Sequence, residues 1–517
     1  MRRWLPLLWL ACTPSVEPRA GAARAEAVDA GALLAESPPP QPVGVSVPEV
    51  AVPLPVLADP PVLEADLGAF AEEFDEGPEE EESESEELEL EPGPEIELGL
   101  DLRNDFEEEP APGENLFKLD TRSLRAKRSI AVRAEPRQEA ASLGTLAQDM
   151  RVRWKQAVKG PGCTAWVEIE PRGWICERYL ESNWREPRTR ELPLLLPEEL
   201  TPGVYAHVSR RARVYESLAE IRRRPRGRRV KGSVTVKLVS EVRRGRRHFW
   251  RTSDGKYIDA RFLRLYTPSE FVGLDRAALE ALSPLVAWAQ SRATPREPVE
   301  VRTGPDAASG RVGVLAPRTV VALQAFSEDG QWARIAPEQW VTAVDLHPLR
   351  AAPALPDLLP GERWLDVDLK EQVLVAYEGV TPVHATLISS GKPLHETPTG
   401  IFRIWLKSAE ADMTGAEGRS RYRVATVPWT MFFEGNFALH TAYWHDRWGE
   451  PVSHGCINLS PRDARALYRW SGPEVPLGWS MAYGTADVLG SRIRVRHGLE
   501  AEGEVPLPVA VSTAPLP

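Results

Sequence analysis

Three short segments of this 517-residue chain align at a constant spacing, and this spacing constrains the fold more than any other feature. They are Trp174–Leu180, Tyr257–Leu263 and Trp340–Leu346, and each begins 83 residues after the one before it. Equal spacing of this kind is typical of related structural units in series. Each unit should open with a short strand of alternating apolar residues, followed by strand-like runs broken by glycine or proline. The expected opening strands are Ile130–Arg133, Val204–Val208 and Val299–Arg302.

The spacing therefore predicts three small β-barrels, over residues 116–185, 200–270 and 295–350. They resemble the bacterial SH3-like domains that bind cell wall. The first one contains Cys163 and Cys176, and a disulfide between them would close a short loop and stabilise the module by about 3 kcal/mol. Two reduced thiols in the core of the module are the alternative.

Basic runs mark the second module, at Arg222–Lys231 and Arg243–Arg247. A secreted protein rarely meets nucleic acid, so we expect no nucleic-acid partner. Anionic glycan, lipid headgroups or an acidic segment of the same chain are candidate partners. A solvated hairpin loop without a partner is the simpler interpretation.

The segment Glu72–Glu109 holds 20 of the 75 acidic residues and one basic residue, Arg103, so its charge is −19. Because the whole chain has a formal net charge of −12, the remainder is positive. A run so charged and so poor in aromatic residues cannot bury enough apolar surface to fold. We expect residues 13–115 to form a disordered, acidic, proline-rich tether and residues 498–517 to form a disordered tail.

The first residues have the layout of a secretion signal, because Arg2 and Arg3 precede a short apolar run, Trp4–Ala11. The run is too short to cross a membrane as a helix. It leads into Cys12 and resembles a bacterial lipobox. This resemblance implies a signal peptide over residues 1–12, lipidation of Cys12 and, with Thr13 next, anchoring to the outer membrane in the periplasm. A soluble secreted form is the alternative.

The segment Ser453–Asn458 places Cys456 directly after a histidine and a glycine, and His440 lies upstream. A thiol is only a few per cent ionised at neutral pH, so attack on an amide needs a neighbouring imidazole, from His440 or His454, to take its proton. Gly455 has no Cβ, so a carbonyl group could approach the nucleophile closely. The backbone N–H groups of Gly455 and Cys456 could then hold the oxyanion.

The run from His440 to Asn458 strongly resembles the signature of the L,D-transpeptidase (YkuD) family, which is a histidine, a spacer, Ser/Thr-His-Gly-Cys, a hydrophobic residue and asparagine. The spacer here is twelve residues, near the short end for that family. A second stretch, Ile388–Phe402, resembles the family's Ser-Thr-Gly and Thr-Pro-x-Gly-x-Phe segments. The resemblance predicts a catalytic domain over residues 360–497, about a quarter of the chain.

The resemblance also implies the role of each site residue. Cys456 is the nucleophile, His440 is the base with Thr441 behind it, and His454 shapes the site. The residues expected at the oxyanion or as positioning groups are Gly455, Ser453, Thr441 and Asn458. The implied reaction passes a peptidoglycan stem-peptide acyl group through a Cys456 thioester to an amine of another stem, an outer-membrane protein or a free D-amino acid. Such a reaction requires no cofactor and no metal.

Two other functions remain open. Water could resolve the thioester, which would make the protein a cysteine peptidase of stem peptides. The domain could instead be degenerate and the chain a structural tether between membrane and wall, although the intact Cys456, His440 and His454 argue against this. A zinc site that also used His445 is disfavoured, because structural zinc sites usually pair their ligands a few residues apart.

Local patterns complete the expected fold of this domain. Glu362–Glu378 and Val383–Ser389 have the composition of strands, and Ser460 with a following proline and Asp463 predicts the start of a helix. Lys407–Arg423 contains glycine and mixed charges, so it has little to bury and is expected to form a mobile lid. The sequence as a whole predicts a mainly β, multidomain protein, in which small SH3-like β-barrels precede a β-rich catalytic domain with a few helices.

Overall fold

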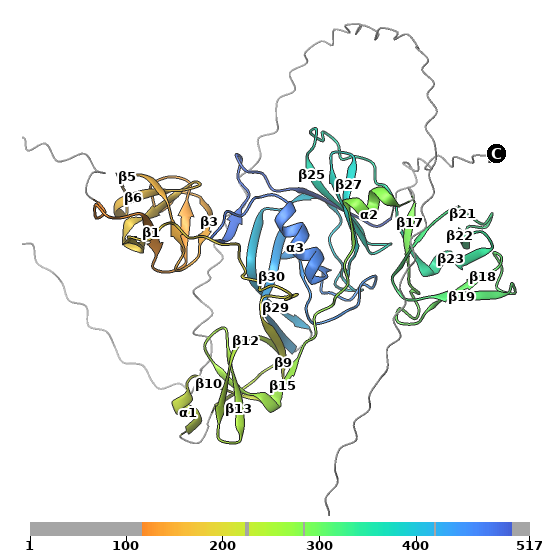
Figure 1. Ribbon diagram of the computed structural model, residues 1–517, viewed down its shortest axis with the longest axis horizontal. Coiled ribbons are helices and arrows are strands. Elements are labelled where there is room, and N and C mark those ends of the chain that lie inside the picture. Colours follow the sequence, from red (N-terminus) through yellow and green to blue (C-terminus); the bar gives the residue numbers. More distant parts are fainter. Residues whose placement is uncertain (1–115, 223–226, 283–284, 418–419, 499–517) are drawn as a thin grey trace, which may run out of the picture. The chain divides into compact units, whose positions relative to one another are not determined.

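The computed structural model describes residues 116–222, 227–282, 285–417 and 420–498 (Figure 1). The expected signal peptide, the Cys12 lipidation site, the acidic tether and nearly all of the C-terminal tail lie outside this part of the chain. The described residues form mostly strands with few helices, so the prediction of a mainly β protein is confirmed. No helix among them has the length and apolar character needed to cross a membrane.

The first module is a two-sheet β structure. Its elements are β1 (Ser123–Ala126), β2 (Ile130–Arg133), β3 (Ser142–Leu146), β4 (Arg151–Val152), β5 (Trp154–Gly160), β6 (Cys163–Ile169), β7 (Trp174–Cys176), the 3-10 turn η2 (Glu177–Tyr179) and β8 (Leu180–Asn183). One sheet has the order β4-β1-β8, and the other strands pair in the order β3-β2-β7-β6-β5. A disulfide joins Cys163 to Cys176, whose Cα atoms are 5.8 Å apart, and so ties β6 to β7.

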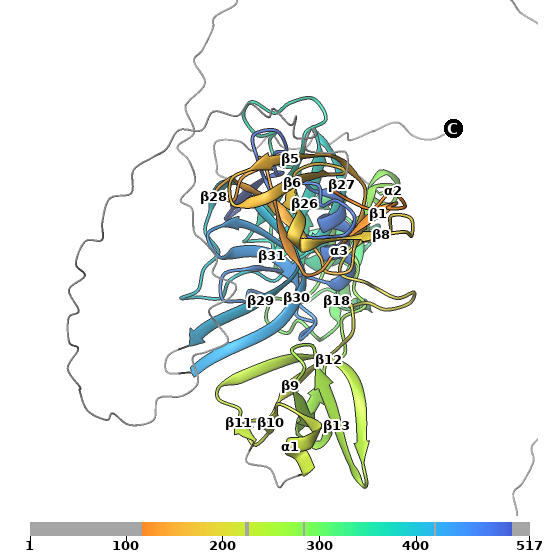
Figure 2. The same cartoon turned by 90° about the vertical axis from the view of Figure 1, so that its left-hand side faces the viewer.

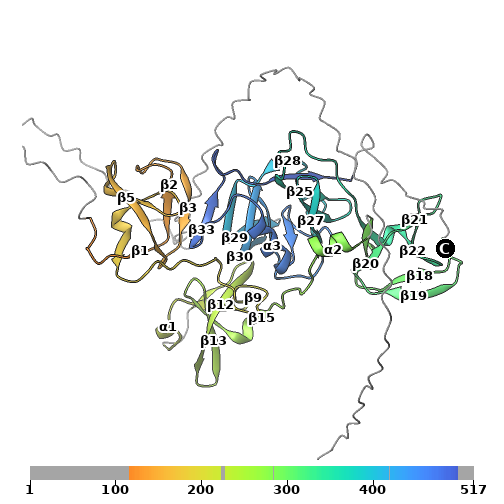
Figure 3. The same cartoon turned by 45° about the horizontal axis from the view of Figure 1, so that its top comes forward.

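The third module repeats this arrangement. Its elements are β17 (Val286–Ala289), β18 (Val299–Arg302), β19 (Arg311–Leu315), β20 (Thr319–Ala322), β21 (Ala325–Phe326), β22 (Trp332–Ala336), β23 (Gln339–Thr342), η4 (Ala343–Asp345) and β24 (Leu346–Leu349). The two sheets have the orders β20-β17-β24 and β19-β18-β23-β22-β21. Figure 3 labels β18 to β22 of this module. The register agrees as well, because Arg133 faces Trp174 in the first module and Arg302 faces Trp340 in the third.

The sequence placed the start of the third module too late, at residue 295. Its first strand is β17, where all four residues are buried. A strand that is buried on both faces shows no alternation of polar and apolar residues, so the pattern used to find opening strands does not detect it.

The second module differs from the other two because it contains a helix, α1, and a long hairpin formed by β12 and β13. Its elements are β9 (Val204–Val208), β10 (Arg213–Tyr215), α1 (Leu218–Arg222), β11 (Arg228–Arg229), β12 (Ser233–Arg244), β13 (Arg247–Thr252), β14 (Tyr257–Asp259), η3 (Ala260–Phe262) and β15 (Leu263–Leu265). The basic run Arg243–Arg247 lies at the exposed tip of the β12–β13 hairpin. In all three modules the aligned segment is a strand, one 3-10 turn and a strand, so the 83-residue repeat in sequence is a repeat in structure.

The C-terminal domain, which the sequence predicts to be catalytic, is built on two sheets and the helix α3. The first sheet has the order β16-β27-β26-β25-β34-β28, and the second pairs β33, β29, β30, β31 and β32 in that order. The elements are β16 (Leu274–Asp275), α2 (Arg276–Ala281), β25 (Arg363–Asp368), β26 (Val373–Glu378), β27 (Thr381–Leu387), β28 (Gly400–Arg403), β29 (Leu406–Glu417), β30 (Ser420–Glu434), β31 (Phe437–Thr441), β32 (Ile457–Leu459), α3 (Pro461–Trp470), β33 (Trp479–Tyr483) and β34 (Arg492–Arg496). The predicted strand regions are confirmed, and Glu362–Glu378 contains two antiparallel strands.

The core of this domain collects apolar side chains from both sheets and from α3. Leu365 and Ile493 come from the first sheet, Met431 and Leu459 from the second, and Leu467 from the helix. The helix begins as predicted, because the Ser460 side chain accepts a hydrogen bond from the Asp463 N–H and a proline occupies the first turn. This helix packs against β30 and against β31, the strand that carries His440.

The expected lid is a regular hairpin. β29 and β30 contain 12 and 15 residues and pair along most of their length (Figure 2). Lys407, at the base of this hairpin, is buried and its Nζ donates a hydrogen bond to the Ser471 carbonyl at 2.7 Å. The prediction that Lys407–Arg423 has little to bury is therefore wrong for its base, since strand pairing brings those residues under the end of α3.

Candidate active site

The candidate nucleophile, Cys456, and the candidate base, His440, lie on or next to two neighbouring parallel strands. β31 and β32 pair Leu439 with Ile457 and His440 with Asn458. Cys456 directly precedes β32, so it is a diagonal neighbour of His440 across the pair. Diagonal neighbours in a sheet have Cα atoms about 7–8 Å apart, which is within reach of an imidazole and a thiol. The pairing of β31 with β32 thus places His440 and Cys456 on neighbouring strands.

Cys456 is a free cysteine with a partly exposed side chain. Burial raises the pKa of the Cys456 thiol, although a hydrogen bond with the Ala438 backbone lowers it. The thiol also donates to the Asn436 carbonyl, which lies 3.8 Å from Sγ. A thiol in this state needs a base before it can attack a carbonyl group.

His440 has the tautomer that such a base requires. Its Nδ1 lies 3.0 Å from the carbonyl oxygen of Thr441. A carbonyl can only accept, so Nδ1 carries the hydrogen and Nε2 has the lone pair. Burial lowers the pKa of His440 to about 4, so the ring is neutral near pH 7. Thr441 therefore contributes its backbone, and its own side-chain oxygen has no hydrogen-bond partner among the described residues.

His445, which the sequence offered only as a disfavoured zinc ligand, lies at the site. Its Nε2 is 2.9 Å from the side-chain amide of Asn458, and its Nδ1 accepts a hydrogen bond from the Arg447 N–H at 3.2 Å. The atom of the Asn458 side chain that faces Nε2 is the amide nitrogen, Nδ2. Burial lowers the pKa of His445 to about 4. His445 therefore orients Asn458, the residue that pairs with His440.

Ser453 and Gly455 build the turn that presents Cys456. The Ser453 Oγ donates to the Cys456 carbonyl at 2.5 Å and accepts from the Gly455 N–H at 3.0 Å. Gly455 has φ of +112°, and a Cβ at this position would lie 2.4 Å from the Phe437 ring, so only glycine fits. The Gly455 N–H, expected at the oxyanion, is thus engaged with Ser453, and Gly455 acts through its backbone conformation.

The two sequence motifs lie side by side. Ser389 and Asn458 exchange backbone hydrogen bonds of 3.0 and 2.9 Å, and Gly391 forms a bridge with Ser453. The His454 ring lies against the rings of His395 and Tyr422, with centroids 4.8 and 5.0 Å away. His454 therefore joins the Thr-Pro stretch to the β29–β30 hairpin.

Metal ligation was also considered from sequence for the histidines near Cys456. Among the described residues, the group of ligand atoms close enough to share an ion is Cys163, Cys176 and Glu177. The first two of these are joined in the disulfide, so their sulfur atoms are not thiolate ligands.

A mainly β domain with a cysteine beside a neutral, oriented imidazole has the groups needed for acyl transfer through a thiol. Residues 362–488 match the family model described as YkuD, the L,D-transpeptidase catalytic domain. YciB of Bacillus subtilis (strain 168), which carries an L,D-transpeptidase name, is 28% identical over 126 residues, or 22% of this chain and 63% of that protein. The chain thus matches less than two thirds of the length of this curated relative.

Solved structures similar to this chain include two L,D-transpeptidases. One, from Enterococcus faecium, is 26% identical over 26% of this chain and 50% of its own, with a TM-score of 0.22. The other, from Mycobacterium smegmatis, is 19% identical over 52% of this chain and 95% of its own, with a TM-score of 0.22. Through the family match, the C-terminal part of this protein, residues 362–488, is a YkuD L,D-transpeptidase catalytic domain.

Proposed function

We propose that this protein is a peptidoglycan L,D-transpeptidase that uses Cys456 as its nucleophile. The observation that carries the proposal is the parallel pairing of β31 and β32, which sets His440 beside the strand that Cys456 precedes. The hydrogen bond from His440 Nδ1 to the Thr441 carbonyl supports the role of base, since it leaves Nε2 to accept a proton.

In the proposed reaction, His440 Nε2 takes the thiol proton and the Cys456 sulfur attacks the carbonyl carbon of an amide in a stem peptide. The C–N bond then breaks, the imidazolium returns its proton to the leaving amine of a terminal D-amino acid, and a thioester remains. An acceptor amine attacks the thioester, gives its proton to His440, and displaces the thiolate. No oxidant or reductant enters these steps, because both are acyl transfers.

The low pKa of His440 leaves its ring neutral, and therefore able to accept a proton, near pH 7. A buried imidazole is neutral at the start of each half-reaction, and its protonated form is costly in a site that excludes water. The imidazolium therefore returns its proton readily to the leaving group. Asn458, held by His445, and Ser453, bonded to the Cys456 carbonyl, are proposed to keep the nucleophile in register with the base.

Carbapenem acylation tests the nucleophile and the base. A thiolate at Cys456 should open the β-lactam ring and leave a stable mass increase on the peptide that contains Cys456. Cys456→Ala should abolish the adduct, and His440→Ala should slow its formation about a hundredfold. Equal labelling of wild type and Cys456→Ala would reject the proposed nucleophile.

Incubation with purified peptidoglycan, followed by digestion and mass spectrometry, tests the reaction class. Transpeptidation should give cross-linked dimers or exchanged terminal residues that depend on Cys456. Shortened monomers alone, with no dimers and no exchange, would instead assign the protein as a cysteine peptidase of stem peptides. An adduct with carbapenem but no change in peptidoglycan would point to a different acyl donor.

We further propose that the chain acts in the periplasm, held by a lipid on Cys12. The lipobox-like run at Leu8–Cys12 supports this. Labelled fatty acid should enter the full-length protein and be lost with Cys12→Ser. Labelling that never appears would favour a soluble secreted enzyme. The acceptor, whether a second stem or an outer-membrane protein, is to be read from the products.

A further inference from the structure

The segment between His440 and Ser453 is held from outside the matched catalytic domain. We define residues 442–452 as the spacer loop. Arg318, which follows β19 in the third module, donates two hydrogen bonds to the carboxylate of Asp446 in this loop, both 2.7 Å long. A two-pronged arginine–carboxylate pair fixes orientation as well as distance. Arg318 lies outside residues 362–488, the part that matches the family model.

A second contact fixes the same loop from the linker before β16. The Ser269 hydroxyl donates to Asp446 at 2.5 Å and accepts from the Trp448 indole N–H at 2.9 Å. The Gln290 side chain, next to β17, donates to the Trp448 carbonyl at 2.8 Å. Trp448 itself is buried in a core that contains Trp288 of the third module. The outer side of the spacer loop is therefore covered by residues of the linker and the third module.

The inner side of the spacer loop contacts the active site directly. The Ser389 hydroxyl donates to the Arg447 carbonyl at 2.7 Å, and the Gly449 N–H donates to the Ile388 carbonyl at 2.8 Å. His445, adjacent to Asp446, holds the side chain of Asn458. A displacement of Asp446 would thus be passed through one peptide bond to His445 and from there to the strand beside His440.

The charge of Asp446 is preserved in this setting. Burial opposes ionisation, but hydrogen bonds from Arg318 and Ser269 outweigh it and lower the pKa of Asp446 below its usual value. The carboxylate is therefore charged when the enzyme works near neutral pH. Removal of Arg318 would leave a half-exposed carboxylate free to turn toward water and take the loop with it.

We infer that Arg318 of the third module is a positioning residue for the active site: by fixing Asp446 it holds the spacer loop so that His445 keeps Asn458 beside His440. The inference rests on the proposed function, since it concerns the reactivity of Cys456. It makes the third module a part of the enzyme and assigns it a role in catalysis beyond any binding to cell wall.

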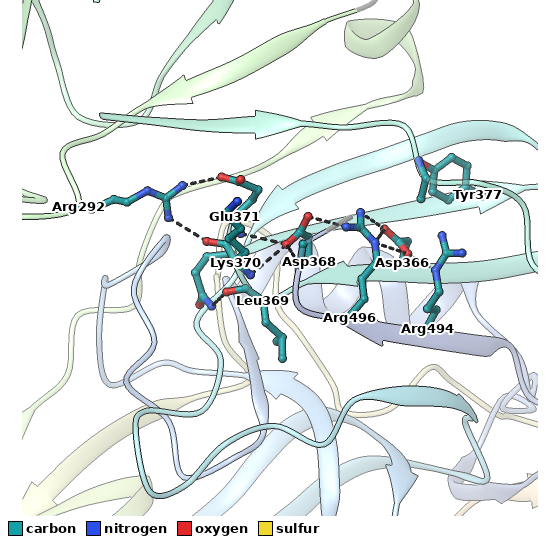
Figure 4. Close-up of polar contacts among 12 residues, drawn as sticks. Arg292, Asp366, Asp368, Leu369, Lys370, Glu371, Tyr377, Arg494 and Arg496 are labelled. Carbon is teal, nitrogen blue, oxygen red and sulfur yellow. Dashed lines mark hydrogen bonds and ion pairs between the residues drawn. The ribbon is translucent and has the colours of Figure 1, made fainter. Parts of the chain in front are cut away.

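Arg292 offers a matched control from the same module. It donates to the Glu371 carboxylate at 2.5 Å and to the carbonyl groups of Lys370 and Leu346 at 2.9 and 3.0 Å. Figure 4 shows this arginine at the turn between β25 and β26, next to the Asp368–Arg496 ion pair. Arg292 therefore joins the third module to the catalytic domain without contacting the spacer loop through any hydrogen bond of the described residues.

The test measures carbapenem acylation of Cys456 in the full-length protein, as a function of drug concentration, for wild type, Arg318→Ala and Arg292→Ala. Arg318→Ala should lower the maximal rate of acylation about 5- to 20-fold and change the half-saturating drug concentration less than about twofold. The reason is that misplacement of a reacting group slows the chemical step more than it weakens binding of the drug. Arg292→Ala should keep the maximal rate within about twofold of wild type. Arg318→Lys, which keeps the charge but lacks the fork, should lie between them.

Charge exchange provides the rescue. Asp446→Arg alone should slow acylation as much as Arg318→Ala, and the double variant Arg318→Asp with Asp446→Arg should regain at least half of the lost rate on a logarithmic scale. Hydrogen exchange of residues 442–452 should increase in Arg318→Ala and stay unchanged in Arg292→Ala. Hydrogen exchange reports how firmly the spacer loop is held, whether or not Cys456 reacts.

The outcomes separate this inference from the proposed function. A wild-type protein that never reacts with carbapenem would reject the proposed nucleophile, and loop exchange would still decide the role of Arg318. Wild-type rates and wild-type exchange in Arg318→Ala would overturn the inference. An equal loss in Arg292→Ala would overturn it too, because it would assign the effect to docking of the module in general.

Discussion

The first and third modules share one strand arrangement but contact the catalytic domain in different ways. The first module contacts β33 and the segment before it, because β3 pairs with β33, and Trp479 and Val475 pack in the core of the module. The third module places Trp288 in a core that also holds Trp364 and Tyr377, and it grips the spacer loop through Arg318. The same fold can therefore serve as an attached module or as a structural part of an active site, and the difference lies in its surface residues.

The comparison implies different consequences for damage to each module. Damage to the first module should stay local, since its partner strand β33 is separated from β31 by β29 and β30 in the second sheet. Injury to the third module should reach Cys456, since its core and its arginine continue into the spacer loop. Four predictions test this difference.

The largest effect is expected from Trp288→Ala compared with Trp166→Ala in the first module. Both tryptophans are buried, and truncation of such a side chain costs about 3–5 kcal/mol of the free energy of unfolding. Trp288→Ala should lower the unfolding midpoint of the catalytic domain and slow Cys456 acylation, whereas Trp166→Ala should leave acylation unchanged. Urea denaturation with parallel acylation assays measures both. Equal loss of Cys456 reactivity in the two variants would contradict the proposed difference between the first and third modules.

Acid should destabilise the third module and the catalytic domain more than the first module. Burial lowers the pKa of His347 to about 4, against about 6.5 in the unfolded chain, so between these values the unfolded state binds a proton that the folded state does not. The free energy of unfolding is thus highest above pH 6.5 and falls by about 3 kcal/mol as the pH drops toward 4. Burial of His440 and His445 acts in the same direction.

The first module is the internal control for this acid effect, because residues 116–185 contain no histidine. Hydrogen exchange at pH 5 and pH 7, corrected for the intrinsic rate, should show lost protection in β17, β24 and β31 before any loss in β1 and β2. Earlier loss of protection in the first module would contradict the assignment of acid sensitivity to these histidines.

The disulfide should stabilise the first module alone. Cys163 and Cys176 are 13 residues apart, and loop closure of this size is worth about 3 kcal/mol in the chain-entropy model. Cys163→Ser with Cys176→Ser should unfold the first module at lower denaturant concentration and leave carbapenem acylation at the wild-type rate. Protease nicking between β5 and β7, followed by mass spectrometry, detects the local change. Slower acylation in this variant would mean that the first module is coupled to the site.

The smallest effect is expected at the β3–β33 contact. A Cβ on Gly144 would lie 2.2 Å from the Met481 carbonyl oxygen, so Gly144→Ala should open this strand pair at a cost of about 1–2 kcal/mol. Hydrogen exchange of β33 should increase while the acylation rate stays unchanged. Gly313→Ala, at an open position of the third module, is the matched glycine control. No change in β33 exchange would show that the strand pair is not held by this contact.

Parts of this fold could be predicted because they depend on neighbours in the sequence. The helix start at Ser460 follows from a hydroxyl, a proline and an acid within one turn, and α3 begins there. The repeated strand, 3-10 turn and strand follow from the pattern of aromatic and apolar residues in each aligned segment. The hairpin of β29 and β30 could not be predicted in this way, since Lys407 is buried by a helix end that lies 64 residues away along the chain.

In the candidate site, too, some features could be predicted from neighbouring residues and others depended on tertiary structure. The residue types at Cys456, His440 and Asn458 were readable in one short stretch of sequence, because a thiol, an imidazole and a glycine-bearing turn define the chemistry wherever they occur together. The sequence also set the charge of the acidic segment and the number of repeats. Tertiary structure alone decided that His445 holds Asn458, that the Gly455 N–H is used by Ser453, and that Arg318 reaches the spacer loop. These contacts depend on strand register and on burial between segments far apart in the chain. A local pattern of residues predicts neither of them.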